Sequence, residues 1–202
     1  MRTSGVHRGL PALAGAAAAA VVCASVAAGP VRSVVYGGSV TLSGKVPTAS
    51  AGQPVSILAR PHGESAFERV GVVTTRAGGA WAYVARPSIR TIYRAEWQGN
   101  ASARIAVTVS PFLNLRVDNG VVRARARVAR PLTGRYVLLQ SRRSGARFHT
   151  LRKLILNRQS TATARQRLPR GRTELRLYMP AAQAGPGYQA GSSSILVYTN
   201  RT

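Results

Sequence analysis

The feature that most constrains this chain is a repeat with an offset of 82 residues. Residues 87–95 read PSIRTIYRA and return at 169–177 as PRGRTELRL, with Pro, Arg, Thr and Arg at four matching places. A repeat of this length is too long for a solenoid unit and has the size of a small β-sandwich. We therefore predict two copies of one domain.

Short alternating segments separated by turn residues run through the first copy. Residues 39–46, for example, place Val40, Leu42 and Val46 on one face and polar side chains on the other, which is typical of a half-buried strand. No ten-residue segment after residue 28 has a helical period, so we predict an all-β fold of two tandem seven-stranded sandwiches. The strands expected in the first copy are residues 31–35, 39–46, 53–60, 66–75, 80–86, 91–97 and 102–109.

The second copy repeats this order from Pro111 onward. Residues 134–142 (GRYVLLQSR) match residues 52–60 (GQPVSILAR) at the same offset, and the main departure is about eight extra residues within 180–193. We expect domains at 30–110 and 111–202, joined by a short linker in which Pro111 fixes one dihedral and restricts the pair. The strands expected in this copy are residues 113–118, 121–128, 134–142, 147–157, 161–168, 172–179 and 194–199.

The corner at Pro87, Thr91 and Tyr93 resembles the tyrosine-corner region of fibronectin type III and other immunoglobulin-like sandwiches. The resemblance implies that the Tyr93 hydroxyl turns back onto upstream backbone. The second copy keeps Pro169 and Thr173 but has Leu175 in place of the tyrosine, so its corner buries an alkyl group instead. As a whole, the chain after residue 28 resembles tandem bacterial immunoglobulin-like domains of secreted proteins from high-GC Gram-positive bacteria.

Residues 1–28 are predicted to be a secretory signal peptide. Arg2 and Arg8 precede an apolar stretch at 10–26, and the small residues at 25–28 fit a cleavage site. A membrane anchor is the alternative, although the stretch is short and alanine-rich for a span. Because Cys23 is the only cysteine, we expect a mature chain without disulfides. We expect it to be secreted, extracellular or peripherally attached to the cell envelope, with no integral membrane span.

Residues suited to catalysis or metal binding are scarce after residue 28. His62 and Glu64 form the only close His–acid pair in the sequence, and no Gly-x-Ser-x-Gly motif accompanies them. The clustered Cys or His of a zinc site and the adjacent carboxylates of a calcium site are both missing. We expect a protein that is not an enzyme and that uses no cofactor or metal.

The chain is strongly basic, with a net charge of +24, and nearly all of its cations are arginine. Residues 111–202 hold 18 basic and 2 acidic residues, against 9 and 3 in residues 30–110. Two explanations stay open: arginine use set by a GC-rich genome, or an anionic partner. The candidate polyanion-binding residues alternate with apolar ones or flank the second corner: Arg123, Arg125, Arg127, Arg165, Arg167, Arg172 and Arg176.

The first functional hypothesis is a secreted, non-enzymatic structural or interaction protein that makes extracellular or cell-envelope contacts. The alternative is a surface protein that binds a polyanion, such as an acidic cell-wall polymer, an anionic lipid surface or a glycan, through the arginines of the second domain. Nucleic acid is disfavoured because aromatic residues do not interleave with these arginines. An accessory carbohydrate-binding role would need exposed aromatics, for which Trp81 and Trp97 are the candidates, although Trp81 falls on an apolar face.

Overall fold

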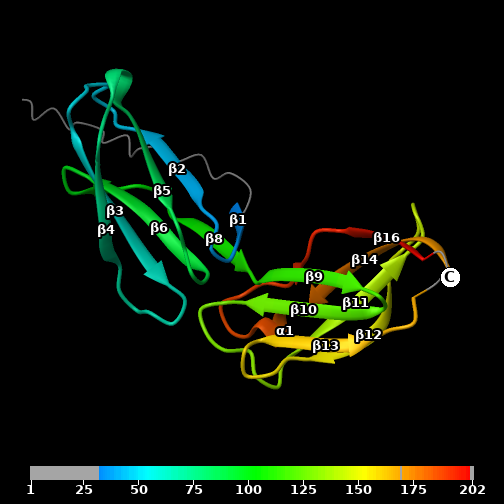
Figure 1. Cartoon of the computed structure of the whole chain (residues 1–202). Coiled ribbons are helices and arrows are strands. Elements are labelled where there is room, and N and C mark those ends of the chain that lie inside the picture. The colour runs from blue at the N-terminus through cyan, green and yellow to red at the C-terminus, as the bar shows by residue number, and fades with distance from the viewer. Residues whose placement is uncertain (1–31, 169, 201–202) are drawn as a thin grey trace, which may run out of the picture.

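A computed structural model describes residues 32–168 and 170–200 as two β-units joined end to end (Figure 1). The predicted all-β fold class is confirmed. The predicted signal peptide and Pro169 lie outside the described residues. The first unit contains β1 (Arg32–Val35), β2 (Val40–Lys45), β3 (Pro54–Pro61), β4 (Glu68–Thr74), the 3-10 turn η1 (Ala77–Gly79), β5 (Ala80–Ala85), β6 (Thr91–Trp97), β7 (Asn100–Ala101) and β8 (Ile105–Ser110).

The strands of the first unit form two sheets around one apolar core. One sheet has the order β1-β8-β6-β3-β4, with the two-residue β7 on β6, and the other is the pair β2-β5. Leu42 and Trp81 from the small sheet pack with Ile57, Tyr93 and Val107 from the large one, and all five are buried. The second and fifth strands therefore face the third, sixth and last strands, which is the arrangement of an immunoglobulin-like sandwich.

The second unit repeats this arrangement. Its sheets have the orders β13-β10-β9 and β12-β11-β14-β15, with β16 also paired to β14. The expected seventh strand is β16, and the short strand β15 lies before it within the extra residues; the two pair with opposite ends of β14. Its elements are β9 (Phe112–Asp118), β10 (Val121–Arg127), β11 (Tyr136–Arg142), β12 (His149–Ile155), β13 (Thr161–Arg165), β14 (Gly171–Met179), α1 (Ala181–Ala184), β15 (Gly191–Ser192) and β16 (Leu196–Asn200).

The predicted strands are present, but two local features differ from expectation. Strand β13 ends at Arg165, so Arg167 lies beyond it rather than within it. The extra residues of the second copy begin with the four-residue helix α1 and continue as a loop to β15. None of the helices in residues 32–168 and 170–200 has the length and hydrophobicity of a membrane span.

The extra residues of the second unit contact the first unit. The Tyr188 hydroxyl donates to the carbonyl of Ser88 at 2.9 Å and accepts from the N–H of Ala129 at 3.2 Å. The N–H of Arg90 donates to the carbonyl of Gly187 at 2.9 Å. A single tyrosine side chain therefore bridges backbone from both units.

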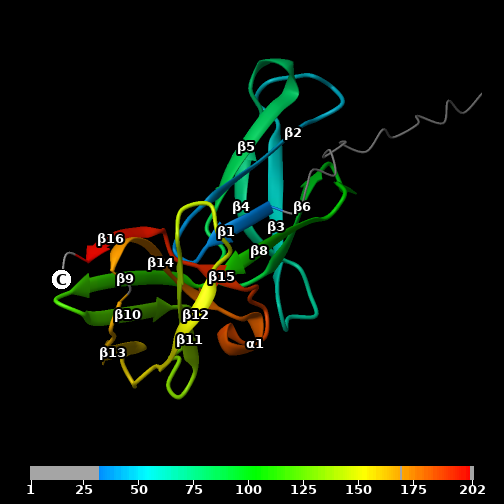
Figure 2. The same cartoon turned by 90° about the vertical axis from the view of Figure 1, so that its right-hand side faces the viewer.

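Apolar packing continues across the same junction. Val109, at the end of β8, is fully buried in the core of the second unit, and Ile89 of the first unit packs against that core. Only Pro111 separates β8 from β9, and Figure 2 shows the two strands following one another where the units meet. The short connection and these lateral contacts are what we expect to restrict the pair.

Candidate functional site

Strand β10 displays the predicted alternation of arginine and small apolar residues. Arg123, Arg125 and Arg127 are exposed, while Val122, Ala124 and Ala126 between them are buried in the core. The small inward side chains let β10 lie in the middle of its sheet between β9 and β13. The three guanidinium groups therefore project from the centre of an outer sheet face rather than from an edge.

Cross-strand register brings further polar residues onto this face. Arg123 lies opposite Arg116 of β9 and Thr163 of β13. Arg125 lies opposite Asn114 and Thr161, and Arg165 lies opposite Val121. We call the exposed outer surface of these strands the basic face, defined by Arg116, Arg123, Arg125, Arg127, Arg165, Asn114, Thr161 and Thr163.

A shallow depression of about 340 Å³ lies on the basic face, lined by Asn114, Arg116, Arg123, Ala124, Arg125, Thr161, Ala162 and Thr163. Its size is at the lower end of the range for small-molecule sites. Its lining combines arginine, threonine and asparagine side chains with Ala124 and Ala162. This chemistry suits an anionic group with hydroxyls nearby.

Arg116 belongs to the basic face but is not among the residues predicted from the sequence, although the sequence contains a signal for its position. Asn119 and Gly120 form the turn between β9 and β10, with φ values of 47° and 70°. An Asn-Gly pair between two alternating segments is typical of a two-residue hairpin, which fixes the register of its strands. That register pairs Asp118 with Val121 and Arg116 with Arg123.

The basic face brings like charges close together. Among the described residues the ion pairs are Arg94–Glu96 at 2.7 Å and Arg142–Glu174 at 2.6 Å, and neither involves the basic face. Arg116 and Arg123 are like charges directly opposite each other, an arrangement that destabilises a sheet. An anion placed between them would relieve this repulsion.

Two of the predicted polyanion-binding residues lie elsewhere. Arg172 and Arg176 belong to β14, which is in the opposite sheet of the sandwich, so their outer face points away from the basic face. Arg176 is also engaged within the chain, since its Nε donates to Gln140 Oε1 at 2.8 Å and its Cζ lies 3.9 Å from the ring centre of Phe148. The seven candidate arginines therefore do not all lie on one surface.

The repeated arginines build the same aromatic stack in each unit. In the first unit, Arg60 and Arg94 lie over Phe67 at 5.0 and 4.4 Å. In the second unit, their counterparts 82 residues on do the same over Phe148, with Arg142 at 4.4 Å and Arg176 at 3.9 Å. Cation–π contacts of this kind are worth about 0.5–1 kcal/mol at exposed sites. The recurrence of these arginines in the sequence therefore has a structural explanation.

One position distinguishes the two stacks. Gln140 accepts from Arg176 in the second unit, whereas Leu58 stands opposite Arg94 in the first. The Nε of Arg94 is buried and has no hydrogen-bond partner among the described residues.

In the corner of the first unit, two polar side chains and a backbone carbonyl interact one after another. Thr91 donates its hydroxyl hydrogen bond to the carbonyl of Ile89 at 2.8 Å, and Tyr93 interacts with the Thr91 side chain. The side-chain hydrogen bond to upstream backbone is therefore made by Thr91. Tyr93 takes part through its interaction with the Thr91 side chain. Burial raises the pKa of Tyr93, the Thr91 hydrogen bond lowers it in part, and Tyr83 raises it further.

The remaining corner residues that the structure describes are buried. Pro87 is buried, and so is Thr173, at 3% exposure, in the second unit. Leu175 is fully buried and packs in the second core, at the place where the first unit has its tyrosine. The second corner is therefore held by apolar contacts.

One pair of residues in the second unit has the form of a catalytic dyad. Ser141 Oγ lies 2.9 Å from His149 Nε2. Ser141 is fully buried, so its hydroxyl is shielded from a substrate. Among residues 32–168 and 170–200, no cluster of three His, Cys, Asp or Glu side chains is placed to hold a metal ion.

The two tryptophans belong to the core of the first unit. Trp81 is 5% exposed, and Trp97 is half-buried against the same cluster. Neither forms part of an open aromatic platform, so they do not build the sugar-stacking site considered from the sequence.

Comparisons with known proteins identify no family for the chain. No protein-family model and no curated protein matches it significantly. Among solved structures, it is similar to the chicken interferon gamma receptor alpha chain, at 10% identity and a TM-score of 0.42, over 79% of this chain and 90% of that one. It is also similar to the FN1–FN3 domains of chicken CNTN1, at 13% identity and a TM-score of 0.31, over 83% of this chain and 64% of that one.

Proposed function

We propose that this chain is a secreted, non-enzymatic interaction protein of two immunoglobulin-like domains, 30–110 and 111–202, that contacts the cell envelope. The basic face of the second domain binds an anionic envelope polymer. The observation that carries the proposal is the group of five exposed arginines on one outer sheet face, none of which is ion-paired within the described residues. Because these guanidinium groups are not paired with a carboxylate among the described residues, they are available to an external anion.

Binding of a polyanion to this face follows from general electrostatics. Guanidinium groups form paired hydrogen bonds with phosphate or carboxylate oxygens. A linear polyanion also carries condensed counterions, and arginine contacts release them. Affinity should therefore fall steeply with salt, which separates this mode of binding from an apolar contact.

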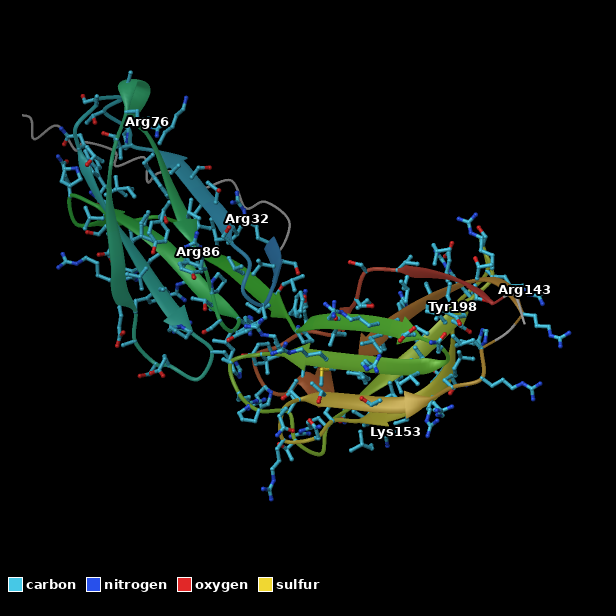
Figure 3. All side chains as sticks on the ribbon, in the orientation of Figure 1. Arg32, Arg76, Arg86, Arg143, Lys153 and Tyr198 are labelled. Carbon is cyan, nitrogen blue, oxygen red and sulfur yellow. The ribbon has the colours of Figure 1, made fainter. Side chains whose placement is uncertain are left out.

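The test compares two triple variants with the same change in charge. The first is Arg123→Gln, Arg125→Gln and Arg127→Gln on the basic face, and the control is Arg69→Gln, Arg76→Gln and Arg86→Gln, all exposed in the first unit. Figure 3 shows Arg76 at the end of the first unit remote from the second. Retention on heparin and on a teichoic-acid resin is measured between low and high salt.

The expected result is loss of retention in the basic-face variant alone. Its slope of log affinity against log salt should fall by about 2–3, the value for three lost contacts. Equal retention of the two variants would show that only overall charge matters and would refute the proposal.

A second candidate is a protein partner at an exposed strand edge. Strand β4 ends its sheet, and Val70 and Val72 on it are 46% and 54% exposed. An unpaired edge with apolar side chains can accept a strand from another chain. Capture of an envelope protein that persists at high salt and is lost in Val72→Lys would favour this candidate.

A further inference from the structure

We propose that the ligand of the basic face is a linear polyol phosphate that lies along β10. This inference rests on the proposed function and specifies its ligand: a chain of phosphodiesters separated by acyclic, hydroxyl-bearing units. The juxtaposition that carries it is a single row of arginines on β10, with the Thr163 hydroxyl on one side of the row and the Asn114 amide on the other.

The row of arginines sets the spacing of the anionic groups. Arg123, Arg125 and Arg127 are two residues apart on one strand, so their Cα atoms are separated by roughly 6.6–6.8 Å. Arg116 and Arg165 lie on the neighbouring strands, one on each side of β10. A polymer with one charge per repeating unit matches such a row, whereas phosphates linked directly to one another are more closely spaced than the row.

Groups suited to hydroxyls lie beside this row. Thr163 is opposite Arg123, and Asn114 is opposite Arg125 on the other side. Neither side chain has a hydrogen bond within the described residues. Thr161 differs, because its hydroxyl already donates to Asn157 Oδ1 at 3.0 Å and keeps only acceptor capacity. The basic face therefore offers the Thr163 hydroxyl and the Asn114 amide to the uncharged units that lie between the phosphates of the polymer.

Among the described residues, the basic face has no row of aromatic side chains between its arginines. Its aromatic residue is Phe112, which is opposite Arg127 at one end and 36% exposed. Elsewhere in the unit, the rings of Phe148 and Tyr136 are covered by cations, with Lys153 Nζ 4.2 Å from the centre of Tyr136. Nucleic-acid bases bind single-strand sites by stacking on aromatic side chains. An acyclic polyol phosphate needs no such platform and fits an arginine row with polar flanks.

One end of the row carries charges of both signs. Asp118 of β9 and Arg165 of β13 lie on either side of Val121, so a phosphate at this end meets a carboxylate on one side and a guanidinium group on the other. We place the ligand along Arg123, Arg125 and Arg127, where the charges on β10 are all positive.

The experiment measures affinities of the mature protein for three polymers at fixed salt: poly(glycerol phosphate), polyphosphate and heparin. The variant is Thr163→Val, which removes one hydroxyl and keeps the β-branched shape, and the control is Thr150→Val, an exposed threonine on β12 in the opposite sheet. We expect Thr163→Val to weaken binding of poly(glycerol phosphate) by about three- to tenfold, the equivalent of one hydrogen bond. Polyphosphate binding should not change, and the control should bind all three polymers like the wild type.

The outcomes separate the two proposals. If all three polymers bind with affinities ordered only by charge density, and Thr163→Val has no selective effect, the proposed function stands and the polyol phosphate is refuted. If none of them is retained by the basic face, both are refuted. Stronger binding of heparin with the same dependence on Thr163 would replace the polyol phosphate by a sulfated glycan and overturn this inference.

Discussion

Substitution of Tyr188 by phenylalanine tests whether the two units are held together through the extra loop of the second unit. The hydroxyl of Tyr188 makes two hydrogen bonds, to the Ser88 carbonyl in the first unit and from the Ala129 N–H in the second. Each such bond contributes about 0.5–1.5 kcal/mol. Ser88 and Ala129 are exposed residues, so water can replace part of what is lost. We therefore expect a loss of about 1–2 kcal/mol in the free energy of unfolding.

The assay is urea unfolding, combined with small-angle scattering of the native protein. Tyr198→Phe is the matched control, because Tyr198 is half-buried on β16, lies away from the junction (Figure 3) and has no side-chain hydrogen bond among the described residues. The Tyr188→Phe protein should unfold at lower urea and show a wider spread of inter-unit separations, while the control keeps wild-type values. Unchanged stability and scattering in Tyr188→Phe would refute the idea that this tyrosine joins the units.

Three further substitutions probe the stack and the corners. Leu58→Gln should raise the free energy of unfolding by about 0.5–1.5 kcal/mol, measured by urea, because it supplies an acceptor to the buried Nε of Arg94. Tyr93→Phe should cost about 1 kcal/mol near neutral pH through the lost interaction with Thr91. The pKa of Tyr93 is raised above 10.0, so the folded state holds its proton more tightly and wild-type stability should fall as pH rises above that value. Unfolding measured across this pH range should show a smaller decline in Tyr93→Phe. Leu175→Tyr should lose about 1–3 kcal/mol, because a larger side chain overpacks a fully buried site.

Local patterns in the sequence predict the elements of this protein well because they depend on residues of the same strand. The alternation along β10 follows directly from small apolar and charged residues at every second position, and strand β6 spans the predicted residues 91–97. Strand β13 is shorter than its alternation suggested. Leu168 is buried beyond the strand end, and the N–H of Gln166 donates to the carbonyl of Gly120 at 2.9 Å, so the apolar pattern continues past the last residue of the strand.

Contacts between distant segments could not be predicted in the same way. Tyr188 and Ser88 are 100 residues apart, and no period or spacing relates them. The separation of Arg172 and Arg176 from the basic face depends on which sheet contains β14, which is a property of strand order rather than of the strand itself. Arg116 is intermediate, because the Asn-Gly turn fixes a register that brings it opposite Arg123.

A comparison of the two copies bears on the two explanations for the arginine excess. Arg123, Arg125 and Arg127 correspond, 82 residues earlier, to Thr41, Ser43 and Lys45 on β2, which are likewise exposed on the outer face of their sheet. A genome that simply favours arginine codons explains why arginine replaces lysine, but it does not explain arginine where the same fold has threonine and serine.

The arginines of the Phe67 and Phe148 stacks, by contrast, occur in both copies because both sandwiches use them. These two groups of arginine therefore differ. One occurs in both units, and the other occurs on a single face of one unit, where Arg116 and Arg123 are like charges opposite each other, an arrangement that destabilises a sheet. A cost confined to one face of one copy is what binding to an anion would maintain.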